Sequence, residues 1–241
     1  MDWTGDGLLL NARPHGESAA IIAVLTPERG LWKGVVRGGG GRRMAPVLQP
    51  GTQLHLHWRA RLDDHLGHFT LEPLRCRAAA IMADPDRLAA LNALCALVLF
   101  ALPERAPHPR LYGVVTVLAD RLAAGESWHG AYLLFERVLL EESGYGLDLT
   151  ECAVTGATEG LVYVSPRTGR AVTARGAGDY ASRLLPLPAL LRDPGGGDDP
   201  KQMAEGLRTT GHFLSEVLAP QLGHKPLPDA RARLAARFSG A

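Results

Sequence analysis

Basic side chains gathered in one stretch of the chain are the clearest candidates for binding chemistry. Between Arg29 and Leu62 the sequence holds seven lysines and arginines and no aspartate or glutamate. The arginine side chain presents a fork of N–H donors that matches the oxygens of a phosphate group. The stretch therefore favours a polyanion as partner, and a basic solvated surface is the alternative interpretation.

Four consecutive glycines, residues 38–41, interrupt this basic stretch between Arg37 and the pair Arg42 and Arg43. Glycine is costly to order, so such a tract indicates a loop that must stay mobile or must let a ligand approach its backbone. We expect a sugar-phosphate chain to be that ligand. A flexible surface loop without a binding role is the alternative.

Alternating residues predict the elements that position these charges. In residues 51–62, Leu54, Leu56 and Trp58 alternate with histidines and arginines, as in a strand with one buried and one cationic face. Four further short strands are predicted within about the first 75 residues. Five such strands favour a barrel of the OB type over residues 1–80, and these barrels bind oligonucleotides across one sheet face.

The predicted nucleic-acid site combines the loop with this face of the barrel. Arg37, Arg42 and Arg43 are expected to project beside Arg59 and Arg61, so that loop and sheet share one ligand. Lys33, on the preceding strand, is included in the site. The predicted binding residues are Lys33, Arg37, Arg42, Arg43, Arg59 and Arg61.

Helical periodicity replaces the strand pattern after residue 80. Asp84 followed by Pro85 is typical of a helix start, and apolar residues recur at helical spacing over 88–102. Similar patterns follow to the end, with Ser127 expected to cap one helix. The fold class is therefore α+β: an OB barrel over 1–80 and a helical domain over 81–241, with a small β insertion at about 147–183.

Enzyme signatures are missing from the sequence. No GxxxxGK[ST], GxSxG or HExxH motif occurs, and no cofactor is expected. Three separated cysteines without a CxxC pair indicate neither a disulfide framework nor a metal site. The remaining metal candidate is a group of histidines without nearby carboxylates or cysteines, which we interpret as surface residues: His55, His57, His65 and His68.

The location is predicted from the N-terminus and from the longest apolar run. MDWTGDGLLL carries acidic residues where a secretory signal would carry basic ones. The apolar run at 88–102 is shorter than the roughly 20 residues that a membrane span needs. We therefore expect a cytoplasmic protein without a membrane partner.

Three short motifs give the sequence a specific resemblance. SPRTGRAV at 165–172, LLPLP at 184–188 and a closing LPDARARL follow the barrel in order. In this arrangement essentially the whole chain resembles the RecO family of bacterial recombination mediators. It departs from the family where many members carry a four-cysteine zinc module, because Cys152 is followed by Thr155 in place of a second cysteine. Without four ligands the insertion is expected to be metal-free.

The resemblance implies a nonenzymatic function in DNA repair. RecO-like proteins bind single- and double-stranded DNA, anneal complementary strands and help to load RecA at gaps. Their partners are RecR and the acidic C-terminal tail of single-strand-binding protein. Arg121, Arg137 and Arg208 are candidates for holding that tail.

Two other classes of function stay open at this point. A protein-interaction scaffold would use the barrel to bind a partner protein, with DNA incidental. A barrel enzyme acting on nucleic acid would show turnover with a divalent metal ion, which we do not expect.

Overall fold

The structure is a computed structural model that describes residues 1–62 and 65–240. The sequence of Asp63 and Asp64 indicates a hairpin turn, and these two residues lie outside the described ones. Two compact units make up the chain, Met1–Glu126 and Ser127–Ala241. Each unit is described by itself below.

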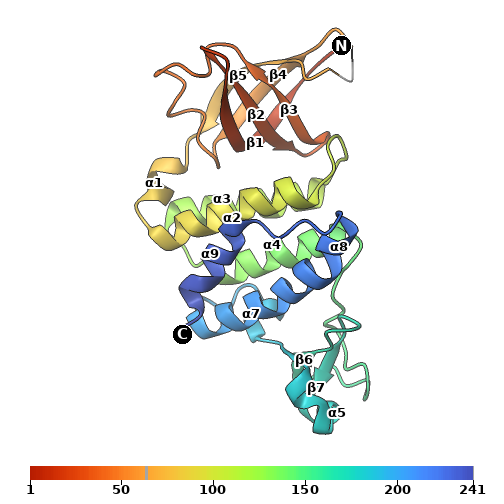
Figure 1. The fold of residues 1–241 in the computed structure, drawn as a ribbon. Coiled ribbons are helices and arrows are strands. Elements are labelled where there is room, and N and C mark those ends of the chain that lie inside the picture. The colour runs from red at the N-terminus through yellow and green to blue at the C-terminus, as the bar shows by residue number, and fades with distance from the viewer. Residues whose placement is uncertain (63–64, 241) are drawn as a thin grey trace. The chain divides into compact units, whose positions relative to one another are not determined.

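Five strands form a closed barrel in the first unit (Figure 1). Their order is β1-β2-β3-β5-β4, with β3 and β5 parallel and the other neighbours antiparallel. This closure confirms the predicted OB-type barrel. The strands are β1 (Asp2–His15), β2 (Ala19–Thr26), β3 (Gly30–Val36), β4 (Gln53–Arg59) and β5 (His68–Arg75).

Aromatic side chains fill the barrel interior. Trp3, Trp32 and Trp58 pack on one another with ring centroids 5.1–6.3 Å apart, and Phe69 lies 5.8 Å from Trp3. Along β4, Leu54, Leu56 and Trp58 are buried while the alternate residues are exposed. The strand therefore has the buried and the polar face that its alternation predicted, and burial of these large side chains stabilises the barrel.

Three helices complete the first unit: α1 (Ala78–Met82), α2 (Pro85–Ala101) and α3 (Pro109–Ala124). The Asp84 side chain accepts hydrogen bonds from the amides of Asp86 and Arg87 at 2.8 and 3.2 Å, which confirms the predicted helix start. Buried Arg77 donates to the Gly51 carbonyl and to Asp120 on α3, at 2.9 and 2.8 Å. This link explains why the compact unit reaches Glu126, although strands give way to helices near residue 78.

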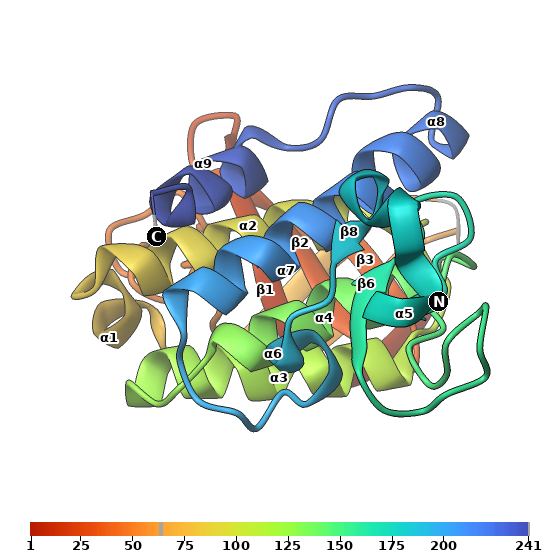
Figure 2. The same cartoon turned by 90° about the horizontal axis from the view of Figure 1, so that it is seen from below.

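Helices also dominate the second unit, where α4 contacts α7 and α7 contacts α9 (Figure 2). A small sheet in the order β7-β6-β8 combines two strands from the insertion predicted at about 147–183 with a third strand from the LLPLP motif. The helices of the insertion are short. Elsewhere in the second unit, a π-helix directly follows α7. The elements are α4 (His129–Glu142), β6 (Leu161–Val164), β7 (Ala171–Thr173), α5 (Ala174–Ala177), η1 (Gly178–Arg183), β8 (Leu185–Pro186), α6 (Ala189–Arg192), α7 (Pro200–His212), η2 (Phe213–Leu218), α8 (Ala219–Gln221) and α9 (Asp229–Phe238).

One buried ion pair joins α4 to α9. Arg231 donates from Nε and Nη2 to the two carboxylate oxygens of Glu136, at 2.6 and 3.1 Å, and from Nη2 to the Leu207 carbonyl at 2.6 Å. Thr210 on α7 donates its hydroxyl to the same carboxylate. Glu136 is fully buried and Arg231 is 4% exposed. The pair therefore fixes three helices around one set of charge-assisted hydrogen bonds.

The start of α4 is capped from a distant loop, which corrects the prediction for Ser127. The Asp198 carboxylate accepts hydrogen bonds from the amides of Trp128 and His129, both at 2.9 Å, and from the Ser127 hydroxyl. Burial alone would raise the pKa of Asp198, but the hydrogen bonds from His129, Trp128 and Ser127 outweigh it and lower the pKa. The resulting stabilisation is complete above about pH 4 and is lost as the pH falls through the lower, folded-state value.

We expect Asp198→Ala to lower the free energy of unfolding by about 1 kcal/mol at pH 7, because the amides at the start of α4 lose their acceptor. Urea unfolding measures this loss, with Glu159→Ala on an exposed loop as the control. The difference between the two variants should shrink as the pH falls below about 4 toward the lowered folded-state pKa of Asp198, where the wild-type carboxylate becomes protonated. Equal stability of the two variants at pH 7 would show that Asp198 does not cap the helix.

Candidate nucleic-acid interface

The glycine tract at 38–41 is a hydrogen-bonded turn packed against the start of β2. The amides of Gly39 and Gly40 donate to the carbonyls of Val36 and Ser18, at 3.2 and 3.0 Å. A Cβ on Gly39 would lie 2.8 Å from the Ala20 Cβ, too close for any other residue without a shift. Close packing therefore explains why Gly39 must be glycine, a reason different from the mobility or ligand approach that the sequence indicates.

Arg37 directly follows β3 and lies beside β4 and β5. The end of β3 and the strands β4 and β5 surround a hollow of about 540 Å³. The register places Arg59 opposite His68, and His57 opposite Thr70. Val36 on β3 pairs with Phe69 on the parallel strand β5, so the next residue, Arg37, lies at the level of Thr70. The polar lining of this cationic hollow is Arg37, His57, Arg59, His68 and Thr70, and its apolar lining is Val36, Met44, Phe69 and Leu71.

Arg37 and Arg59 supply the fixed positive charge of the cationic hollow. Both are exposed, and among the described residues neither takes part in an ion pair. Asp2 is the carboxylate that β1 brings nearest, since it lies opposite Arg59 in the strand register. Two guanidinium groups above a polar sheet surface form a site suited to phosphate oxygens.

The other predicted binding residues lie outside this hollow. Lys33 is bound to Glu104 at 2.6 Å and lines a separate hollow that also contains Arg13. Arg42 and Arg43 are exposed on the turn after the glycine tract, and Arg61 is exposed beyond the end of β4. The structure therefore brings Arg37 and Arg59 together and separates Lys33 from them.

Carboxylates lie beside two of the histidines, contrary to the sequence interpretation. Because β1 pairs with β4, His55 Nδ1 lies 2.6 Å from Asp6 Oδ1, and His57 Nε2 lies 3.7 Å from Asp2 Oδ2. Within residues 1–62 and 65–240, no three His, Cys, Asp or Glu side chains are arranged to hold a metal ion. His57, His68 and Thr70 were not among the predicted DNA-binding residues. Alternation along the chain places His57 on the same face as Arg59, whereas only the strand register brings His68 and Thr70 beside them.

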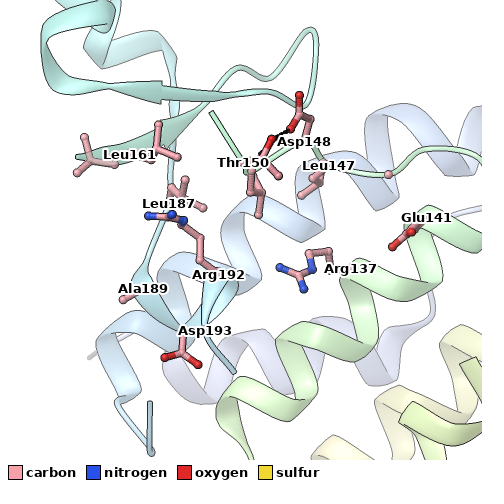
Figure 3. A pocket seen from close by; sticks show the side chains of 13 residues that line it. Arg137, Glu141, Leu147, Asp148, Thr150, Leu161, Leu187, Ala189, Arg192 and Asp193 are labelled. Atoms are coloured by element: carbon pink, nitrogen blue, oxygen red, sulfur yellow. Dashed lines mark hydrogen bonds between the residues drawn. The ribbon is translucent and has the colours of Figure 1, made fainter. Parts of the chain in front are cut away.

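A groove of about 1000 Å³ lies in the second unit between α4, the insertion and the LLPLP segment (Figure 3). Arg137 extends from α4 toward the segment that carries Arg192, and its Nη1 donates to the Leu191 carbonyl at 2.8 Å. Leucines form the apolar part of the walls. The groove also contains acidic residues, of which Asp148 is bound to Arg170 at 3.3 Å. The lining of this helical-unit groove includes Arg137, Glu141, Leu147, Asp148, Leu161, Leu187, Arg192 and Asp193.

The three candidate partner-binding arginines do not share one hollow. Arg137 lines the helical-unit groove, whereas Arg208 is exposed on α7. Arg121 belongs to the first compact unit, where it lines a hollow beside Arg75 and Arg77. Arg192 was missed from sequence because nothing in the local pattern places it next to α4.

The turn at Cys152 is closed by hydrogen bonds. The Cys152 thiol is 1% exposed and accepts the Thr173 amide at 3.3 Å, while its own amide donates to the Ala157 carbonyl at 2.8 Å. Thr173 thus links the turn to β7. The metal-free insertion stays a prediction.

Comparison with known proteins assigns the family. The family model for the recombination protein O N terminal matches residues 1–77, and the model for its C terminal matches residues 82–226. The chain is 57% identical to the DNA repair protein RecO of Roseobacter denitrificans over 239 residues, which cover 99% of both chains. It is 54% identical to that of a Ruegeria species over 233 residues, covering 97% of this chain and 96% of the relative. The chain therefore belongs to the RecO family of DNA repair proteins.

No helix formed by the described residues combines the length and the apolar character needed to cross a bilayer.

Proposed function

We propose that this protein is a nonenzymatic mediator of homologous recombination that binds single- and double-stranded DNA and anneals complementary strands. With RecR it helps to load RecA at gaps coated by single-strand-binding protein, and it acts in the cytoplasm, where a bacterial chromosome is repaired. Family membership over nearly the whole chain supports this proposal. The finer activities come from the resemblance and are what the experiments below address.

The cationic hollow is the main structural observation that supports the proposed DNA binding. Two arginines that form no ion pair among the described residues flank a polar strand surface of an OB-type barrel. Barrels of this type bind oligonucleotides across a sheet face and its loops. The barrel tryptophans are buried, so charge rather than base stacking supplies most of the affinity, and sequence preference is slight. Arg37 and Arg59 form the centre of the site. Arg42, Arg43 and Arg61 are proposed as flanking phosphate contacts, and Lys33 is the weakest candidate because Glu104 holds it.

Strand annealing is the activity that separates a mediator from a protein-interaction scaffold. Fluorescently labelled complementary strands are mixed with the protein, once naked and once coated with single-strand-binding protein, and duplex formation is followed in time. The proposal expects faster annealing in both cases, without nucleotide hydrolysis and without added metal. A protein that leaves both rates unchanged would support the scaffold.

The helical-unit groove is proposed as the site for the acidic tail of single-strand-binding protein. Its apolar walls suit a peptide side chain, and Arg137 and Arg192 in its lining can pair with carboxylates. Glu141 and Asp193 in the same lining limit the number of acidic groups that fit. Of the three arginines predicted from the sequence, Arg137 is therefore the main candidate for binding the tail. Arg121 and Arg208 are proposed only as secondary contacts.

Replacing Arg192 by glutamate should weaken binding of the tail peptide about 10-fold or more, because an attractive charge becomes repulsive. Arg192 is exposed, so the fold should tolerate the change. Fluorescence anisotropy of a labelled tail peptide, titrated with the full-length protein, measures the dissociation constant. Arg233→Glu, at an exposed position on α9 that does not line the groove, is the matched control and should change the dissociation constant less than threefold. Equal effects of both substitutions would place the tail elsewhere.

A further inference from the structure

Two histidines line the cationic hollow together with its arginines. His68 lies directly opposite Arg59 and His57 directly opposite Thr70, on the antiparallel strands β5 and β4. Arg37 reaches the same hollow from the end of β3, the other neighbour of β5. Neighbouring strands lie about 4.8 Å apart, so one phosphate group spans the distance between donors on adjacent strands.

Imidazole chemistry makes these two residues different from the arginines beside them. A neutral imidazole offers one N–H donor, whereas the protonated ring offers two and carries a positive charge. The change takes place near pH 6.5 for an ordinary histidine. An anion held between two imidazoles stabilises their protonated forms, so binding of the anion and uptake of protons favour each other.

We propose that His57 and His68 bind the DNA phosphate together with Arg37 and Arg59, and that this binding is coupled to proton uptake. The ligand class is a phosphodiester of the DNA backbone. The inference rests on the proposed DNA-binding function and adds two binding residues and a pH dependence to it. Affinity for DNA accordingly rises as the pH falls from 8 to 6.

Several charged groups surround the two histidines. Asp2 Oδ2 on β1 lies 3.7 Å from His57 Nε2. Asp63 and Asp64 precede β5 in sequence and lie outside the described residues. The charged groups that the strand register places nearest are Asp2 on β1, Arg37 after β3, His55 and Arg59 on β4, and Glu72 on β5.

The test is the dissociation constant of a single-stranded oligonucleotide at pH 6, 7 and 8 at constant ionic strength. If the phosphate raises the pKa of one histidine by one unit, affinity increases about sixfold between pH 8 and pH 6. Two histidines then give about 40-fold. The double variant His57→Gln with His68→Gln should lose most of this increase and should come closest to the wild type at pH 8, because an ordinary histidine is almost fully deprotonated there.

His55→Gln is the matched control, because His55 lies on the same strand face but is held by Asp6 outside the hollow. It should keep the wild-type pH dependence. All three histidines are exposed, and circular dichroism checks that each variant is folded. A double variant with the full pH dependence overturns the inference and leaves the proposed function standing. A wild-type protein that binds no DNA at any pH overturns both.

Discussion

Glu136→Gln is expected to lower the free energy of unfolding of the second compact unit by about 3–5 kcal/mol. The substitution keeps the shape of the side chain but removes the negative charge. Arg231, which is 4% exposed, is then left as a buried cation with neutral partners only. An uncompensated buried charge is among the few changes that cost this much.

Urea unfolding monitored by far-ultraviolet circular dichroism measures this loss, and Glu205→Gln on α7 is the control. Glu205 is partly exposed, so its substitution should change stability by less than about 0.5 kcal/mol. The double variant Glu136→Leu with Arg231→Met removes both charges and should recover most of the loss. If Glu136→Gln is as stable as its control, the buried pair does not hold α4 and α9 together.

Reversing both arginines of the cationic hollow should have the largest effect on function. Arg37→Glu with Arg59→Glu is expected to weaken binding of single-stranded DNA about 100-fold at moderate salt, since two charge-assisted contacts to phosphate are lost. Both side chains are exposed, so the barrel should fold normally. Lys33→Glu adds the same type of charge change on the same barrel but outside the hollow, and it should weaken binding much less. Comparable losses in both variants would indicate a general charge effect without a defined site.

Local patterns were sufficient to predict most elements of the fold. The alternation in β4 gave the correct buried residues, and Asp84 with Pro85 gave the correct start of α2. Both depend on neighbours within a few positions in the chain, where side-chain periodicity and capping act. The motifs at 165–172 and 184–188 indicated the RecO family, and the comparisons confirm this family.

Contacts between distant segments could not be predicted in the same way. Asp198 caps a helix 70 residues earlier, and Arg231 pairs with Glu136 across 95 residues. A charged residue in a short terminal helix is normally expected at the surface. The burial of Arg231 can therefore be understood only once its partner Glu136 is known. Likewise the parallel pairing of β3 with β5 has no local signal, yet it places β5, with His68 and Thr70, between the strand that leads to Arg37 and the strand that carries Arg59.

The salt dependence of DNA binding tests the central claim most directly. The dissociation constant for a single-stranded oligonucleotide is measured across a salt series for the wild type and for Arg37→Glu with Arg59→Glu. If the hollow binds the phosphate backbone, the wild-type affinity falls steeply with salt, and the slope of log K against log salt becomes smaller by about 0.7 for each lost contact, or about 1.4 in total. A folded double variant that keeps the wild-type affinity and slope would show that the cationic hollow is not the DNA site.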